Sequence, residues 1–175
     1  MIKVVIADDH TMFVDGIESI LKNETNIKVV DRCFNGKKVF DILKKKAVDV
    51  LLLDINLPEL NGIQVAQRIQ KEYPQVKILA LSMYNEESFV TEILKSGALG
   101  YVLKNTDRIE LIKAIETVAS GQTYFSAEVT ETIMGRLRKK NTQKNKNNIL
   151  LPKISRRERE VLTLIVKEHT TQEIA

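Results

Sequence analysis

The chain has 175 residues, of which 43% are hydrophobic, so it can form one medium-sized domain or one domain followed by a smaller one. Its single cysteine, Cys33, excludes an internal disulfide framework, and no apolar run reaches the roughly 18 residues of a membrane span. The first residues enter a strand pattern directly, without a signal peptide. We therefore expect a soluble, cytoplasmic protein with no membrane partner, in which Cys33 is a small core residue.

Charge is distributed unevenly along the chain. The formal net charge is +4, but residues 1–135 carry −3 and residues 136–175 carry +7. A basic C-terminal part indicates either a surface that faces nucleic acid or a solvated linker. Residues 141–148 contain no apolar side chain to bury, so the linker is the better interpretation for them.

Two patterns alternate over the first 120 residues or so. Short apolar runs predict strands, and apolar residues at helical spacing between them predict helices. The predicted strands cover residues 2–7, 27–31, 49–54, 76–81 and 100–103. The predicted helices follow His10, Gly36, Gly62, Glu86 and Asp107. This alternation predicts a doubly wound α/β fold with a parallel sheet and helices on both faces.

Two helical patterns carry explicit expectations about which residues are buried. In the helix after Asp107, the side chains expected to face the core are Ile109, Leu111, Ile112, Ala114, Ile115 and Val118. A helical extension is expected over residues 127–140, with Val129, Ile133, Met134 and Leu137 on one side. It follows Tyr124 and Phe125 and would dock on the preceding domain or act as a spacer.

Polar side chains stand at the carboxyl ends of four predicted strands. They are Asp8 and Asp9 after the first strand, Asp54 at the end of the third, Ser82 after the fourth and Lys104 after the fifth. In a doubly wound sheet these ends converge where such folds bind their ligands. Taken singly, Asp54 is equally well explained as a residue that solvates the strand end or caps the turn. Lys104 alone is better explained as a solvated surface lysine, and Ser82 alone as an ordinary loop hydroxyl. Chance is a poor explanation for all four positions together.

The chemistry of this set indicates phosphoryl transfer. Three carboxylates repel one another unless a cation lies between them, and hard oxygen ligands suit Mg²⁺. Asp54 would attack phosphorus to form an acyl phosphate. Mg²⁺ and Lys104 would offset charge on the phosphoryl oxygens, and Ser82 would donate a hydrogen bond to one of them.

These motifs resemble the receiver domain of bacterial two-component response regulators. The resemblance covers about residues 2–120 and includes residues 8–10, 53–58, Ser82 and Lys104. It implies a (βα)5 receiver fold of the flavodoxin type with strand order 2-1-3-4-5. It also implies that a histidine kinase phosphorylates Asp54. The same resemblance implies that Mg²⁺ is bound by Asp8 or Asp9 of the acid pair, by Asp54 and by the backbone carbonyl of Asn56.

The resemblance further implies a switch pair, Ser82 and Tyr101. Phosphorylation would draw Ser82 inward and let the ring of Tyr101, expected as a half-buried strand aromatic, turn in. Two positions depart from the commoner family pattern. Serine stands where threonine is more frequent, and Asn105 replaces the proline that often follows the lysine, which puts a cis peptide at Lys104–Asn105 in doubt.

Residues 155–162 and 172–175 resemble the start of a LuxR-type helix-turn-helix, as in the NarL/FixJ class of regulators, and Ser155 with Glu158 forms a capping-box pattern. We therefore predict three parts: a receiver domain (1–122), a helical extension with a polar linker (123–152), and the start of an all-α helix-turn-helix domain (153–175). The recognition helix is missing, so this chain is expected not to bind DNA specifically, unlike its full-length parent. Phosphorylation is expected to favour a homodimer.

Two other functions compete with this interpretation. An aspartyl-phosphate phosphohydrolase also uses an aspartate beside Mg²⁺, but such enzymes typically need a second acid two residues after the nucleophile, where this chain has Asn56. A receiver that acts only through contacts with protein partners is the second alternative. We expect a signalling protein that promotes its own phosphotransfer and dephosphorylation, and not an enzyme with a separate substrate.

Overall fold

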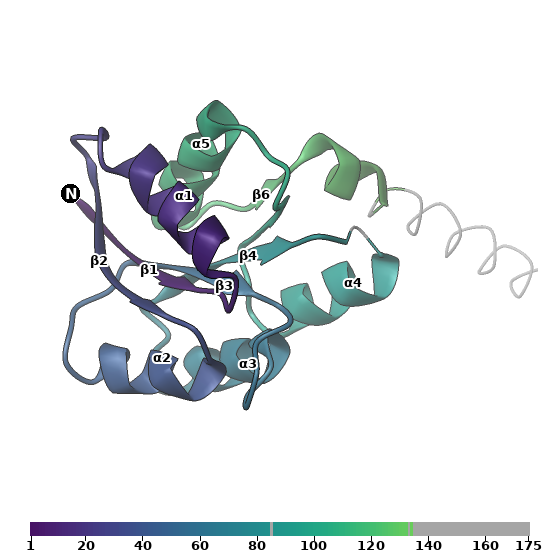
Figure 1. Cartoon of the computed structure of the whole chain (residues 1–175). Helices are drawn as coiled ribbons and strands as arrows, with labels where there is room; N and C mark the ends of the chain where they lie inside the picture. The colour runs from purple at the N-terminus through teal and green to yellow at the C-terminus, as the bar shows by residue number, and fades with distance from the viewer. Residues whose placement is uncertain (85, 133, 135–175) are drawn as a thin grey trace, which may run out of the picture. The chain divides into compact units, whose positions relative to one another are not determined.

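The computed structural model describes residues 1–84, 86–132 and 134. The strands are β1 (Ile2–Ala7), β2 (Ile27–Cys33), β3 (Val50–Asp54), β4 (Lys77–Ser82), β5 (Gly100–Leu103) and β6 (Tyr124–Phe125). The helices are α1 (Thr11–Leu21), α2 (Gly36–Leu43), α3 (Gly62–Glu72), α4 (Glu87–Lys95) and α5 (Arg108–Ala119). All strand pairs are parallel, and the order in the sheet is β2-β1-β3-β4-β5-β6 (Figure 1).

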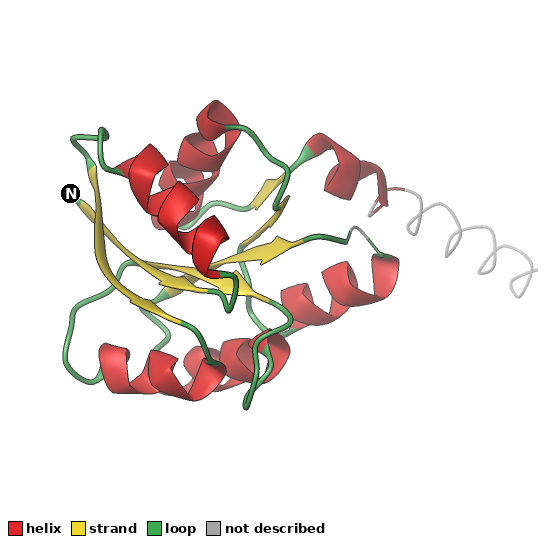
Figure 2. Ribbon diagram, in the orientation of Figure 1, coloured by secondary structure: helices red, strands yellow, loops and turns green. Residues whose placement is uncertain are grey.

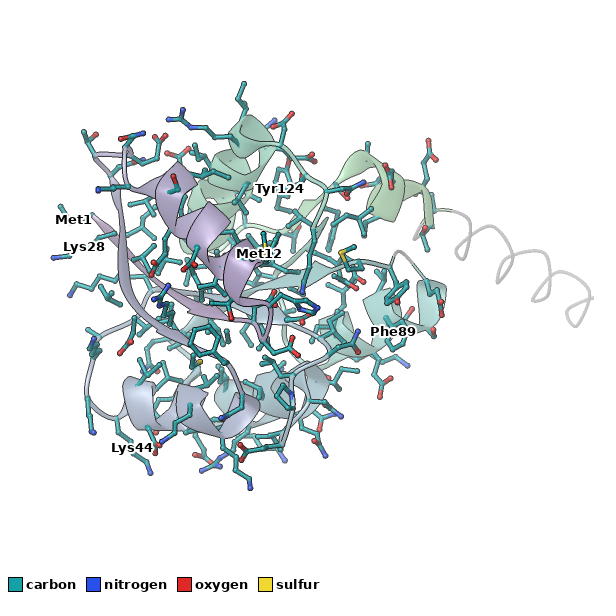
Figure 3. The ribbon with its side chains drawn as sticks, in the orientation of Figure 1. Met1, Met12, Lys28, Lys44, Phe89 and Tyr124 are labelled. Atoms are coloured by element: carbon teal, nitrogen blue, oxygen red, sulfur yellow. The ribbon has the colours of Figure 1, made fainter. Side chains whose placement is uncertain are left out.

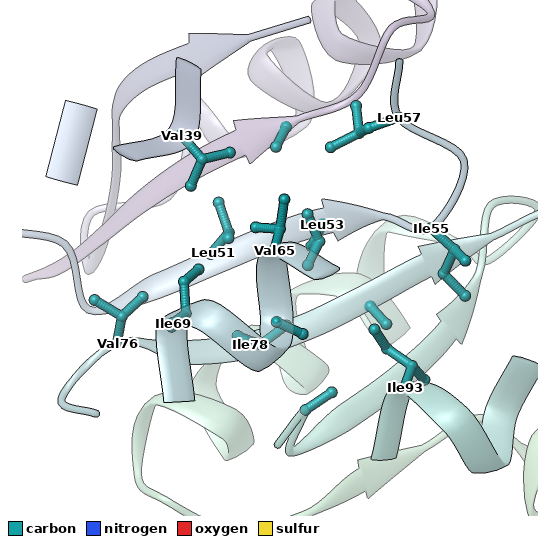
Figure 4. Close-up of a cluster of buried hydrophobic side chains, with 14 of the residues drawn as sticks. Val39, Leu51, Leu53, Ile55, Leu57, Val65, Ile69, Val76, Ile78 and Ile93 are labelled. Atoms are coloured by element: carbon teal, nitrogen blue, oxygen red, sulfur yellow. The ribbon is translucent and has the colours of Figure 1, made fainter. Parts of the chain in front are cut away.

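The sheet is covered on both faces, with α1 and α5 on one side and α2, α3 and α4 on the other (Figure 2). Successive residues of a strand point to opposite faces, so Leu51 and Leu53 pack under α2 and α3 while Val50 and Leu52 pack under α1 and α5. Figure 4 shows the first of these two clusters. A strand buried on both faces needs the continuous apolar run that β3 has.

The predicted α/β class and the order of the first five strands are confirmed. Cys33 is buried at the end of β2, as expected. The sixth strand was not predicted: β6 pairs with β5 at Gly100↔Tyr124 and Tyr101↔Phe125. None of the helices in the described part of the chain has the length and hydropathy needed to cross a lipid bilayer.

One expectation about buried residues was wrong. Ile109 is 78% exposed, because it lies in the first turn of α5 on the side opposite the buried Leu111, Ala114 and Ile115. In the predicted extension, residues 127–132 are helical; Val129 is buried, whereas Met134 is exposed. The rest of that extension, the linker and the helix-turn-helix segment lie outside the described residues, so the boundaries of the three parts stay predictions.

The loop after β3 is fixed by a close approach of backbone to backbone. Asn61 caps α3 in a capping box with Gln64, and the N–H of Gly62 donates to the carbonyl of Ile55 at 2.9 Å. A Cβ at Gly62 would lie 2.2 Å from the carbonyl oxygen of Asp54 and 2.8 Å from the Cα of Ile55. The beginning of α3 is therefore set directly against the end of β3, where Asp54 stands.

We expect Gly62→Ala to lower the free energy of unfolding by about 1–3 kcal/mol, because the new methyl group must displace backbone. The control is Gly16→Ala in α1, where a Cβ meets nothing within 4 Å. It should raise the free energy of unfolding by about 0.5–1 kcal/mol, since alanine loses less entropy in a helix. Urea unfolding followed by circular dichroism measures both. Equal effects of the two substitutions would contradict the close approach at Gly62.

Candidate functional site

The carboxyl edge of the sheet brings together the residues singled out in the sequence. Asp8 directly follows β1 and is 0% exposed, while Asp54 ends β3 and is 2% exposed. Ser82 ends the neighbouring β4 and is also buried, and Lys104 directly follows β5. The parallel pairing of β1, β3, β4 and β5 places these ends side by side. Asp9 lies beside them but is exposed.

Lys104 lies between the two buried carboxylates. Its Nζ is 2.7 Å from Asp8 Oδ2 and 3.0 Å from Asp54 Oδ2, and its side chain is only 5% exposed. Its backbone N–H donates to the carbonyl of Ser82 at 2.8 Å, which continues the β4–β5 ladder and fixes where the side chain starts. Its Nζ also lies 5.1 Å from the centre of the Phe13 ring, within the range of a cation–π interaction.

The surroundings of Asp54 raise the pKa of its carboxyl group. Burial is the largest cause, because it disfavours the charged form, and the negative charge of Asp8 adds to it. The Lys104 ammonium and the backbone N–H of Asn56 act in the opposite direction, since both stabilise the carboxylate. The effect of burial on the pKa of Asp54 is therefore larger than the opposing effect of Lys104 and Asn56, and the folded chain favours the protonated form.

His10 belongs to the same cluster, although the sequence pattern predicted no role for it. Its Nδ1 is 2.9 Å from Asp9 Oδ1 and 3.1 Å from Asp8 Oδ1, and its backbone N–H donates to Asp8 Oδ1 at 2.9 Å. The ring is mostly exposed. Its position directly after the acid pair was the only sequence signal for this placement.

The acidic cluster fits a divalent cation. Asp8, Asp9, His10 and Asp54 each offer one ligand atom, and these four atoms lie within 4.8 Å of one another. Asp8 Oδ2 and Asp54 Oδ2 are buried, and within the described residues neither has a hydrogen-bond partner, although Lys104 Nζ lies 2.7 and 3.0 Å from them as an ion-pair partner. Buried carboxylate oxygens with spare lone pairs are ligands that Mg²⁺ accepts. Asn56 follows two residues after Asp54 and is exposed.

Tyr84 joins the two residues of the predicted switch pair. The hydroxyl of Tyr101 donates to the carbonyl of Tyr84 at 2.5 Å, and the N–H of Tyr84 donates to Ser82 Oγ at 3.1 Å. Tyr101 is fully buried, not half-buried as expected, and burial is the largest cause that raises the pKa of its hydroxyl. All peptide bonds in the described part are trans, including Lys104–Asn105.

The site combines the buried Asp8 after β1, the buried Asp54 at the end of β3 and the ion-paired Lys104 after β5. Together with a parallel sheet of this strand order, these three residues define a receiver domain. The family model described as the response regulator receiver domain matches residues 4–116. The chain belongs to this family and is a two-component response regulator of the NarL/LuxR type.

Three relatives illustrate the similarity. The transcriptional regulatory protein DegU of Brevibacillus brevis is 39% identical over 138 residues, which are 79% of this chain and 58% of DegU, less than two thirds of its length. The oxygen regulatory protein NreC of Staphylococcus carnosus is 34% identical over 175 residues, 99% of this chain and 81% of NreC. The response regulator RcsB of Salmonella typhimurium superposes with a TM-score of 0.70 at 25% identity, over 99% of this chain and 81% of that one.

The raised pKa of Asp54 has a consequence for stability. The folded chain holds the Asp54 proton more tightly than the unfolded chain, so the associated stability is present at low pH and is lost as the pH rises through the folded pKa. Asp54→Asn, which is neutral at every pH, should therefore raise the free energy of unfolding at pH 7 in metal-free buffer. The gain over wild type should shrink towards pH 4.

Urea unfolding of wild type and Asp54→Asn at both pH values measures this difference. Asp41→Asn is the matched control, because Asp41 is an exposed carboxylate on α2 that lies 3.5 Å from Lys38. Its effect should be within about 0.5 kcal/mol, as for most surface substitutions. A variant Asp54→Asn that is less stable than wild type at pH 7 would show that Lys104 outweighs burial.

Proposed function

We propose that Asp54 accepts a phosphoryl group from a sensor histidine kinase and that this modification switches a transcriptional regulator. The observation that carries the proposal is the buried triad of Asp8, Asp54 and Lys104, with Lys104 Nζ 3.0 Å from Asp54 Oδ2. A purely structural aspartate at a strand end would not need a second buried acid and a buried ammonium beside it.

The residues divide the work of the transfer. An Asp54 carboxylate oxygen forms a bond to phosphorus while the bond from phosphorus to the nitrogen of the phosphohistidine breaks, and the departing imidazole takes up a proton. The ammonium of Lys104 is already in place to offset charge on a phosphoryl oxygen. Ser82 Oγ, at the end of the adjacent strand, then donates to another phosphoryl oxygen.

The acid pair Asp8 and Asp9, Asp54 and the backbone carbonyl of Asn56 would hold Mg²⁺. When bound, the ion supplies positive charge that draws together the carboxylates and the phosphoryl oxygens, which otherwise repel one another. The two buried carboxylate oxygens without hydrogen bonds support this assignment. His10 stays a neighbour of the acid pair, since imidazole is a softer ligand than Mg²⁺ prefers.

Ser82 and Tyr101 form the switch. As Ser82 Oγ turns toward the phosphoryl group, it gives up the hydrogen bond that it accepts from the N–H of Tyr84. The Tyr84 carbonyl is then free to shift, and Tyr101 loses the fixed acceptor of its hydroxyl. A charge change at Asp54 thereby reaches an aromatic side chain on β5.

The output we propose is a change in homodimerisation and in DNA binding by a LuxR-type effector domain that begins near residue 153. Dimers of the relative RcsB have been described bound to two parallel DNAs, which supports this assignment. The receiver would comprise residues 1–122 and the linker 123–152, in a cytoplasmic protein. Asn56 in place of a second acid supports a signalling role over turnover of a separate phosphorylated substrate.

Phosphorylation can be tested with acetyl phosphate and Mg²⁺, followed by intact mass. Wild type should gain one phosphoryl group. Asp54→Asn should gain none, because an amide is a poor nucleophile. Wild type in EDTA should also gain none, because no Mg²⁺ then offsets the charge of the carboxylates and the phosphoryl oxygens. The control Asp41→Asn should behave as wild type. Labelling of Asp54→Asn at the wild-type level would place the acceptor elsewhere.

Metal binding can be tested without any phosphodonor. Mg²⁺ at about ten times its dissociation constant should stabilise the fold by about 1.4 kcal/mol, which corresponds to a rise in Tm of a few degrees. Asp9→Asn should reduce this rise, since Asp9 offers a ligand oxygen but is exposed and not needed for packing. An equal rise in the wild type, Asp9→Asn and Asp54→Asn would show that Mg²⁺ binds at another place.

A further inference from the structure

The segment that leaves the receiver is hydrogen-bonded to the backbone of Tyr101. Residues 124–132, called here the exit segment, begin with β6, whose Phe125 is paired with Tyr101. The N–H of Ser126 donates to the carbonyl of Tyr101 at 3.3 Å, and the N–H of Tyr124 donates to the carbonyl of Leu99 at 3.1 Å. A movement of β5 at Tyr101 therefore changes the first hydrogen bonds of the exit segment.

The exit segment also shares a hydrophobic cluster with Tyr101. Val129 is 0% exposed and belongs to the same buried cluster as Tyr101, Val90 and Ile93. Phe125 of the edge strand β6 and Phe89 of α4 are partly buried and pack against this cluster. Figure 3 shows Phe89 on α4. Glu128, which precedes Val129, is exposed. One valine thus buries the first helical turn of the exit segment in the cluster on the α2, α3 and α4 side of the sheet, which also contains Tyr101.

The packed exit segment buries one polar group that has no partner among the described residues, the hydroxyl of Ser126. Ser126 is buried, and within the described residues its Oγ has no hydrogen-bond partner. Its carbonyl is satisfied, because it accepts from the N–H of Thr130 at 2.9 Å and from Thr130 Oγ1 at 3.0 Å. A buried hydroxyl without a partner destabilises the state that buries it, and water can satisfy it once the segment detaches. Backbone hydrogen bonds and Val129 therefore stabilise the attachment of the exit segment, while the buried hydroxyl of Ser126 destabilises it.

We propose that the exit segment is the output element of the receiver, seated on β5 when Asp54 is unphosphorylated and released when Asp54 is phosphorylated. The inference rests on the proposed phosphorylation of Asp54. The signal passes from Ser82 to the backbone of Tyr84, then to the hydroxyl of Tyr101, and from the Tyr101 carbonyl to Ser126. Val129 and Ser126 are positioning residues, since they act on the site through Tyr101 and do not touch the phosphoryl group.

Coupling of this kind is reciprocal, so the exit segment must also influence phosphorylation. A change that weakens the seat should favour the phosphorylated state, and a change that strengthens the seat should oppose it. Val129→Ala removes two methyl groups from the buried cluster and weakens the seat. Ser126→Ala removes the hydroxyl without a partner and strengthens it.

The experiment is hydrogen exchange of the peptide that contains residues 124–132, with and without acetyl phosphate and Mg²⁺, on samples whose phosphorylation is verified by intact mass. In phosphorylated wild type, exchange in this peptide should rise by about fivefold or more, the lower end of allosteric couplings. In unphosphorylated Val129→Ala exchange should already be raised, and in Ser126→Ala it should be lowered. At a fixed concentration of acetyl phosphate and Mg²⁺, the phosphorylated fraction at its plateau should change in the same two directions.

Two controls separate coupling from general destabilisation. Glu128→Ala changes an exposed neighbour on the same helical turn and should alter neither the hydrogen exchange of residues 124–132 nor the phosphorylated fraction. Val4→Ala makes the same chemical change as Val129→Ala at a buried position of β1 on the α1 and α5 side, so it should lower stability without raising the phosphorylated fraction.

The outcomes are distinguishable. Verified phosphorylation with unchanged exchange in residues 124–132 overturns the output element and leaves the proposed function intact. Parallel effects of Val129→Ala and Val4→Ala on the phosphorylated fraction also overturn it, because a loss of stability would then be enough to explain both. A wild-type chain that takes up no phosphoryl group overturns the proposed function and this inference with it.

Discussion

The placement of one ammonium group between two buried carboxylates governs the arrangement of the site. Asp8 and Asp54 would repel each other at the ends of the adjacent strands β1 and β3, and Lys104 reaches both from the end of β5, two strands beyond β3. An ion pair buried in this way gains less from attraction than its groups lose in hydration, so it is poor evidence for stability. Its value is that the charges are already oriented when a phosphoryl group arrives.

The fold supplies this arrangement because every strand involved is parallel and ends at the same edge. β1, β3 and β4 are buried on both faces, so a register slip would move each apolar side chain into the differently shaped core on the other face. At the same edge, Gly62 lets α3 begin directly against the end of β3. The rigid core therefore fixes the acids and the lysine, while the exposed Asp9 and His10 stand where a partner can reach them.

Sequence patterns predicted the sheet and the convergence of Asp8, Asp54, Ser82 and Lys104 at one of its edges. Both could be predicted because continuous apolar runs, and the polar residues that end them, depend on local chemistry. They failed where the outcome depends on contacts between distant segments. β6 is two residues long and has no pattern of its own; its pairing comes from β5. The position of His10 depends on side-chain torsions at the end of β1. The burial of Tyr101 depends on the acceptor that Tyr84 offers.

The short sixth strand has a consequence for how the protein behaves in a crowded solution. With β6 in place, the ladder groups of Leu99 and Tyr101 are paired, and β2 forms the opposite border of the sheet. If β6 leaves, β5 becomes a border strand of four residues. A border that short offers little to a foreign strand, which is one way natural sheets avoid joining edge to edge. The signalling state can therefore expose backbone at little risk of aggregation.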